Sequence, residues 1–345
     1  MKKSEDVFDG EQLSLDTFQK EPSVVTSKAL LHIMDTIDQT EQQHITEEVT
    51  SSSKSSLITD KKKVVVSNTF VVGIEQGSSL AYKLSRVAIA QIPMDAKTLP
   101  LTVITANDIE AMGYTRQRLT GHMNEIIDDI LNYRIKLTQI EKLHNKTTRM
   151  TGINVFAQAS VVPGKGAIMV QLNPLLIDHF LSLRADFTSY SLPSILKLPG
   201  ISTPKLHDLL LSRAKKYDTH LLKFKIEDLI VILNYTSTSK SFTPSIFVNN
   251  VIKRAVKAIN EESELQVEWF GVKTGRACTD IRFYVRYEWT TKEEKRQTLD
   301  WEEAVAKTDT EEGKRIRAER KKIETLLNTG KGEVYLFASN NYNTN

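Results

Sequence analysis

The chain has 345 residues, 40% of them hydrophobic, which is enough for two domains with packed cores. Residues 1–61 hold 6 basic and 12 acidic side chains, residues 62–288 hold 29 and 20, and residues 289–345 hold 11 of each. The single cysteine, Cys278, excludes an intrachain disulfide or a cysteine-based zinc site, and no run approaches the ~18 apolar residues of a membrane span. We expect a soluble cytoplasmic protein with no membrane partner. The excess of basic residues over 62–288, the basic middle of the chain, favours a polyanionic partner.

The first 61 residues are rich in Ser, Thr, Gln and Glu and contain the low-complexity run 50–56. Such a segment buries too little apolar surface to offset the entropy of ordering, so we expect a disordered tail. A short amphipathic piece around Ala29 to Ile37 is either a transient helix or a docking motif. Order is expected to begin near Lys62.

The first half of the basic middle reads as helices followed by strands. Apolar periodicity predicts a helix over 80–92, a strand over 101–104, a brief helix that Thr105 caps and Gly113 stops, and a longer helix over 115–131. Strands are predicted over 133–140, 153–160 and 167–172, followed by a helix over 173–181. A short helix, a glycine turn and a longer helix with cations at its start form a helix-turn-helix pattern. The candidate DNA contacts of this half are Arg116, Gln117, Arg118, Thr120 and Asn124 on the helix, and Lys146, Arg149 and Lys165 on the turns.

The second half repeats this order after a junction over 190–200. Thr203 is expected to cap a helix that has Pro204 at its first position, and further helices are predicted over 226–233 and 247–260. Alternating strands over 265–269 and 281–287 flank the basic turn 273–276. The predicted fold class is α+β, with two tandem winged-helix (helix-turn-helix plus β-wing) domains at 62–200 and 201–290 between disordered or flexible tails. The second tail, 291–345, is expected to be partly helical around 315–322.

A helix with a polar, basic face beside a basic hairpin is the layout of a winged helix on DNA, although a solvated charged face would have the same pattern. Asn and Lys side chains reach the acceptors of base edges, and other cations bind phosphates. We assign base reading to Thr243, Ser245, Asn249, Asn250 and Lys253. We assign phosphate contacts to Lys257, Lys273, Arg276 and Arg282.

The sequence contains none of the common catalytic motifs considered below. The chain has no G-x-x-x-x-G-K-[ST] and no G-x-G-x-x-G after a strand. Its seven histidines form neither His-x-His, which metal-dependent rolling-circle nickases need, nor His-Glu-x-x-His. Asp128 and Asp129 are adjacent on a predicted helix and therefore point in different directions. We expect no enzyme, no catalytic residue, no cofactor and no metal.

The region from Phe247 to Asn260, with Lys253, Ala255 and Ile259, resembles the second recognition helix of the plasmid replication initiator family that contains RepA, RepB and RepE-type proteins. Gly275-Arg276 followed by Ile281-Arg282-Phe283 resembles the family's wing. In the first half, the order of motifs matches that of the family at 84–92, 104–108, Asn173-Pro174 and 190–192. The resemblance covers roughly residues 64–287. His207 and Thr274 depart from it, where members often have tyrosine and a second lysine.

The resemblance implies a mechanism without covalent catalysis. Monomers would bind direct repeats (iterons) in the double-stranded DNA of a plasmid origin, with the first domain on the backbone and the second reading sequence. They would help to open the adjacent AT-rich DNA and recruit the host initiator and helicase. A homodimer, formed through the first domain, would repress the initiator's own promoter. The alternatives are a two-domain transcriptional regulator, a protein-interaction scaffold and, more remotely, a nickase.

Overall fold

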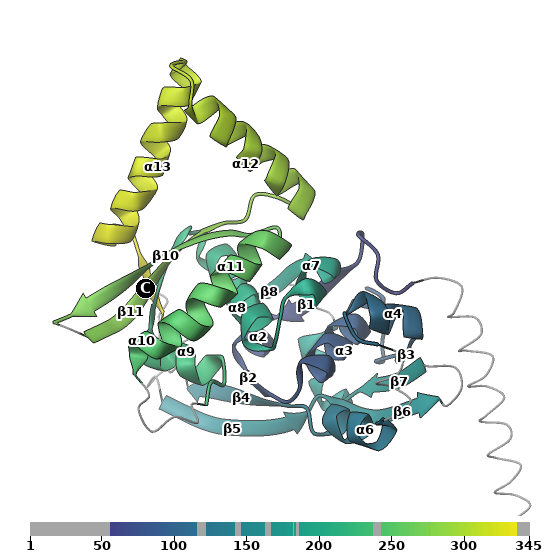
Figure 1. Ribbon diagram of the computed structural model, residues 1–345. Coiled ribbons are helices and arrows are strands. Elements are labelled where there is room, and N and C mark those ends of the chain that lie inside the picture. The colour runs from purple at the N-terminus through teal and green to yellow at the C-terminus, as the bar shows by residue number, and fades with distance from the viewer. Residues whose placement is uncertain are drawn as a thin grey trace, which may run out of the picture. The chain divides into compact units, whose positions relative to one another are not determined.

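The structure, a computed structural model, describes residues 56–336 except 116–121, 142–145, 163–166, 182, 184–185, 237–242 and 276 (Figure 1). Helices and strands alternate along these residues, as the α+β prediction requires. None of the helices in the described ranges is long and apolar enough to cross a membrane. The amphipathic piece predicted around Ala29 lies outside the described residues.

The first half contains three small sheets with helices packed on them. Their strand orders are β1-β8, β2-β4-β5 and β3-β7-β6. The strands are β1 (Lys63–Ser67), β2 (Ile74–Gln76), β3 (Leu101–Ile104), β4 (Arg134–Glu141), β5 (Lys146–Asn154), β6 (Phe156–Val162), β7 (Ala167–Leu172) and β8 (Phe187–Ser191). The helices are α2 (Asn68–Val72), α3 (Ser79–Ala90), α4 (Ala106–Ala111), α6 (Met123–Leu131), the 3-10 helix η2 (Pro174–His179) and α7 (Leu192–Lys197).

Local sequence signals account for several of these elements. The Ser78 hydroxyl accepts the N–H of Ala81 at the start of α3, and Thr105 and Asp108 form a capping box on α4. The predicted helix and strand at 80–92 and 101–104 are confirmed within two residues.

Several predictions for this half are wrong. The helix expected over 115–131 includes neither Thr115 nor His122, and α6 begins at Met123. The turn expected to carry Lys146 and Arg149 is the start of β5. The single strand expected over 153–160 is broken at buried Val155, because the chain leaves the sheet of β4 there and enters that of β7. The expected junction 190–200 holds the end of β8 and all of α7, and its role as a domain boundary stays a prediction. β8 forms only by pairing with β1, which lies more than 120 residues earlier, so local sequence could not indicate it.

The second half contains one four-stranded sheet with the order β10-β11-β9-β12. Its strands are β9 (Leu221–Lys225), β10 (Gln266–Thr274), β11 (Ala277–Arg286) and β12 (Val334–Leu336). Its helices are α8 (Ser202–Tyr217), α9 (Ile226–Ile232), α10 (Pro244–Phe247), the π-helical η3 (Val248–Ile252), α11 (Lys253–Glu262), α12 (Lys292–Ala306) and α13 (Glu311–Thr329). The capping role predicted for Thr203 is wrong: α8 begins at Ser202, Ile201 is its cap, and Thr203 is buried inside it.

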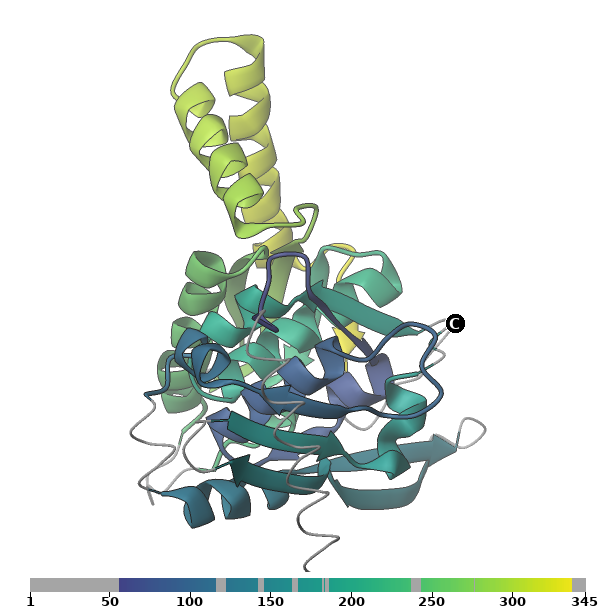
Figure 2. The same ribbon diagram turned by 90° about the vertical axis from the view of Figure 1, so that its right-hand side faces the viewer.

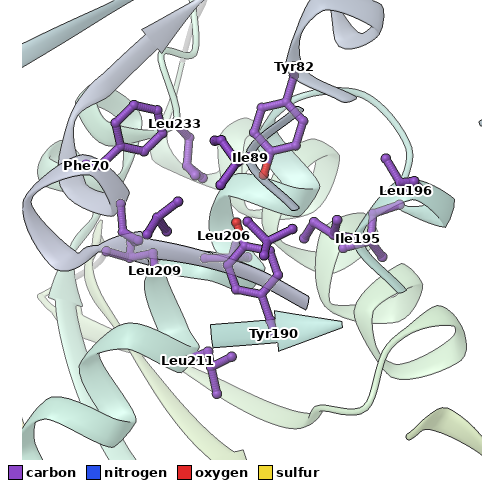
Figure 3. Packing of buried hydrophobic residues seen from close by; sticks show 14 of the residues in the cluster. Phe70, Tyr82, Ile89, Tyr190, Ile195, Leu196, Leu206, Leu209, Leu211 and Leu233 are labelled. Atoms are coloured by element: carbon purple, nitrogen blue, oxygen red, sulfur yellow. The ribbon is translucent and has the colours of Figure 1, made fainter. Parts of the chain in front are cut away.

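Helix α8 lies in a hydrophobic core that both halves share. Leu206, Leu209 and Leu210 are fully buried, and α8 contacts α2 and β8 as well as α11 and β11. Figure 3 shows Leu206 and Leu209 among side chains that include Phe70 and Tyr190. The boundary between residues 200 and 201 stays a prediction.

A charged cluster is buried beside this core. Glu75 of β2 is 2% exposed, and its Oε1 accepts from Arg86 Nη2 of α3 at 2.9 Å and from Lys205 Nζ of α8 at 2.7 Å. The hydroxyl of Tyr133 donates to Glu75 Oε2. Burial alone would raise the pKa of Glu75, but Arg86 and Lys205 lower it to about 2. The ion pair between Lys205 and Glu75 therefore joins α8 to β2.

A second buried carboxylate, that of Asp208, lies on α8 about one helical turn after Lys205. It accepts hydrogen bonds from the hydroxyls of Tyr82 at 3.0 Å and Tyr190 at 2.8 Å, and Arg86 lies 3.5 Å away. His207 is fully buried and contacts Asp208 through Nδ1 at 3.2 Å. This second set of polar contacts also spans the two halves.

Candidate nucleic-acid interface

An exposed polar helix face of the second half runs along α10, η3 and α11. Thr243 caps α10 by accepting the N–H of Ile246, and Pro244 occupies the first turn. Phe247, Ile252 and Ile259 point into the core and are fully buried. The predicted base-reading residues Thr243, Ser245, Asn249, Asn250 and Lys253, and the predicted phosphate contact Lys257, are all exposed on the other side.

The π-helical segment η3 lies in the middle of this face. A π-turn inserts one residue into the helical repeat and rotates the side chains that follow it, and such turns often occur at functional sites. Asn249 and Asn250 lie in this segment, and both are exposed. Apolar periodicity alone could not predict the π-turn, because the buried stripe continues on both sides.

The side chains of Asn249, Asn250 and Lys253 are free for a ligand. Within the described part of the chain, no hydrogen bond or ion pair occupies them. Lys257 is 3.8 Å from Glu261, and both are largely exposed, so the pair contributes little and leaves the ammonium accessible. Amides and ammonium groups with this freedom can donate to base edges or phosphates.

The hairpin of β10 and β11 provides the predicted wing. Its turn has Gly275 at φ +64°, a left-handed conformation that favours glycine, with a register shift at Val272 and Lys273. Lys273 and Thr274 are exposed at the tip. Arg276, the other predicted wing cation, lies outside the described residues.

The end of α11 is tied to the wing by side-chain bonds to the backbone. Asn260 donates through Nδ2 to Val267 O at 2.9 Å and accepts from Val267 N at 2.7 Å. Ser263 donates to Ile259 O at 2.8 Å and accepts from Leu265 N at 3.2 Å. Helix and hairpin therefore have a defined angle between them, a role of Asn260 that the sequence pattern did not reveal.

Arg282 does not occupy the position predicted for it. The neighbouring residues Ile281 and Phe283 face the core, so Arg282 faces the opposite side of the sheet, across from Phe270 and Lys223. The C-terminal chain covers it there: Arg282 Nη1 donates to Leu327 O at 3.0 Å and Asn328 O at 2.8 Å, and Nε donates to Glu333. Arg282 is 8% exposed, so we withdraw it as a phosphate contact.

The candidates of the first half are described only in part. Asn124 is exposed in the first turn of α6, and His122 beside it makes an exposed pair with Glu125. Arg116, Gln117, Arg118, Thr120 and Lys165 lie outside the described residues. Lys146 and Arg149 lie on β5, but the description does not extend to their side chains. Asn124 is therefore the only predicted contact of this half whose side chain has a described position.

Among the described residues, no three His, Cys, Asp or Glu side chains gather as they would around a metal ion. Burial raises the pKa of the Cys278 thiol, which makes it less nucleophilic at neutral pH.

Comparisons with known proteins agree with the fold. The family model described as "Initiator Replication protein, WH1" matches residues 24–211, and the one described as "Initiator Rep protein, WH2" matches residues 225–285. The chain is also similar to a solved structure described as "Crystal structure of Pi initiator protein in complex with iteron DNA". The identity is 18% and the TM-score 0.54, with 67% of this chain and 100% of that chain covered. No curated protein sequence matches the chain. The prediction of two tandem winged-helix domains is confirmed.

Proposed function

The chain belongs to the initiator Rep protein family, because the WH1 model alone spans more than half of it, and on that premise we propose that it initiates plasmid replication by binding direct repeats (iterons) at an origin. The observation that carries the proposal is the row of exposed side chains from Thr243 to Lys257 on a helix that is bonded to a basic-tipped wing. The similar Pi protein was solved with iteron DNA, which supports the same ligand class here.

In this proposal α10, η3 and α11 enter the major groove and the wing lies along the backbone. Asn249 and Asn250 would pair with adenine edges and Lys253 with guanine acceptors, since these pairings match in geometry. Thr243 and Ser245 would contact bases near the helix start. Lys257, Lys273 and Arg276 would bind phosphates and set the register.

The first winged helix would contact the neighbouring stretch of the same duplex through Asn124 and the predicted residues around it. Family resemblance further supports a role in opening AT-rich DNA, recruitment of the host initiator and helicase, and repression of its own promoter by a dimer formed through the first domain. These steps are proposals that follow from the binding step.

The test is a titration of the full chain at physiological salt with two duplexes. The DNA that flanks the coding region is searched for tandem repeats spaced by roughly two helical turns; one duplex carries these repeats, and the other carries the same bases scrambled. We expect specific binding at least about 10³-fold tighter than non-specific binding, with a footprint on each repeat. Equal affinity for the two duplexes would refute sequence-specific origin binding and favour a general polyanion or protein-binding role.

The salt dependence of binding tests the wing. Lys273→Ala should make the negative slope of log K against log salt less steep by about one, because one fewer counterion is released on binding. The sequence predicts the same for Arg276→Ala. Lys314→Ala, an exposed lysine on α13, is the matched control and should leave the slope unchanged. An unchanged slope in the Lys273 variant would exclude its phosphate contact.

A further inference from the structure

The chain from Lys292 to Leu336 lies outside both matched family models, yet it is bonded to the second winged helix. Helices α12 and α13 contact each other and form a helical hairpin whose two helices diverge from their connection in Figure 1; Figure 2 shows the same hairpin turned by 90°. Arg286 of β11 donates to both carboxylate oxygens of Glu302 in α12, at 3.0 and 2.8 Å. β12 pairs with β9 in parallel, and Arg282 holds the end of α13. This helical pair is therefore anchored on two strands of the sheet.

A buried lysine of the same segment reaches the joint between α11 and the wing. Lys295 lies in the first half of α12 and is 3% exposed. Its Nζ donates to Asn260 O at 2.6 Å and to Leu265 O at 2.8 Å. Asn260 lies in the last turn of α11, and Leu265 immediately precedes β10. One ammonium group thus bridges the end of the recognition helix and the start of the wing strand.

The electrostatics of this position favour a cation. The last carbonyls of a helix carry partial negative charge, which an ammonium group stabilises. Burial lowers the pKa of Lys295 to about 8, with Glu264 and Glu262 acting against that shift and Lys292 adding to it. The group is therefore still mainly protonated at pH 7. A buried ammonium is costly unless its hydrogen bonds are made, so both carbonyls are held close to it.

Lys292 provides a comparison on the same helix. It also faces the end of α11, where it pairs with Glu262 at 2.9 Å, but it is 40% exposed and donates to no backbone carbonyl of the joint. Removing its charge would cost little. The two lysines therefore differ in the feature that matters here, the bridge between helix and wing.

We propose that Lys295 is a positioning residue for base reading: it bridges Asn260 O and Leu265 O and so holds the angle between α11 and the wing. This inference rests on the proposed DNA-binding function. Hydrogen bonds to base edges weaken steeply when donors are misaligned, whereas phosphate contacts tolerate movement. Loss of the bridge therefore lowers affinity for the cognate repeats more than affinity for random DNA.

The experiment compares Lys295→Met, Lys295→Arg and Lys292→Met with the unmodified full chain. Each is titrated with the tandem-repeat duplex and the scrambled duplex at one salt concentration, after thermal melting has shown which variants are folded. For Lys295→Met we expect cognate affinity to fall on the order of ten-fold, the equivalent of one charge-assisted hydrogen bond. Affinity for scrambled DNA stays within about two-fold, because no phosphate contact is lost. Lys295→Arg restores much of the discrimination, and Lys292→Met behaves like the unmodified chain.

Hydrogen exchange supplies a readout that needs no DNA. Amides of 260–267 exchange faster in Lys295→Met than in Lys292→Met, while those of the first half do not change. Equal loss on both duplexes, or unchanged exchange at the joint, overturns the positioning role. If the unmodified chain itself shows no preference for the repeats, the proposed function fails, and the inference fails with it. If the unmodified chain discriminates and Lys295→Met discriminates equally well, the inference alone fails.

Discussion

Glu75→Gln is expected to lower the free energy of unfolding by roughly 3–5 kcal/mol, the usual cost of removing one partner from a buried ion pair. Arg86 and Lys205 both donate to Glu75 Oε1 and are themselves buried, so the variant leaves Lys205 without its ion-pair partner and Arg86 with Asp208 alone, 3.5 Å away. Chemical denaturation should show a lower midpoint with an unchanged slope. A loss below about 1 kcal/mol, within the range of ordinary substitutions, would show that the cluster does not need this carboxylate.

The matched control is Asp129→Asn, which removes an exposed carboxylate from α6. Surface substitutions of this kind usually change stability by less than about 0.5 kcal/mol. A similar loss in both variants would point to net charge rather than to the buried pair.

The stability difference between the unmodified chain and Glu75→Gln should depend on pH in a defined direction. The pKa of Glu75 is lowered from 4.5 to about 2 in the folded chain, so its contribution is fully present above pH 4.5 and is lost as the pH falls toward about 2. The difference in stability between the unmodified chain and Glu75→Gln should be constant between pH 6 and 7 and shrink below pH 4.5. A difference that grew on acidification would contradict this assignment.

Lys253→Ala is expected to cost roughly 1–3 kcal/mol of binding free energy on the cognate repeat and little on scrambled DNA. Lys253 is exposed at the start of α11, next to Asn249 and Asn250, and within the described part of the chain its ammonium has no other partner. Titrations of both duplexes at one salt concentration measure the two losses.

Arg254→Ala is the control for this measurement, because Arg254 is a neighbouring exposed cation to which no base contact is assigned. It should weaken the two duplexes equally or not at all. If Lys253→Ala also weakens both equally, Lys253 binds phosphate and its base-reading role is wrong.

These predictions depend unequally on sequence and on structure. The buried positions Phe247, Ala255 and Ile259 were visible as helical periodicity, and the exposed candidates follow from them directly. The wing was visible as alternation around a glycine turn. Arg282 shows the limit of this reasoning. Alternation places it opposite the core, but only residues some 45–51 positions later decide that it binds carbonyls and a carboxylate instead of phosphate.

The C-terminal segment shows the same limit on a larger scale. Its mixed charges predicted a solvated helix around 315–322, and α13 does cover those residues. The contact between α13 and α12 was not visible in the sequence, because it needs few apolar residues. Ile316 and Ala306 are buried in it. Gly313 fits against Val305 O and Thr308 O, where a Cβ would lie 2.6 Å from both oxygens.

The sequence by itself determined the two-domain winged-helix order, the exposed face from Thr243 to Lys257 and the basic turn, because each is a local pattern of period, charge or glycine placement. Tertiary structure alone decided the pairing of β1 with β8, the cluster around Glu75, the burial of Arg282 and the bridge from Lys295 to the end of α11. Each of these joins residues that are far apart in the chain, and burial and hydrogen-bond geometry select such partners only when the elements pack together.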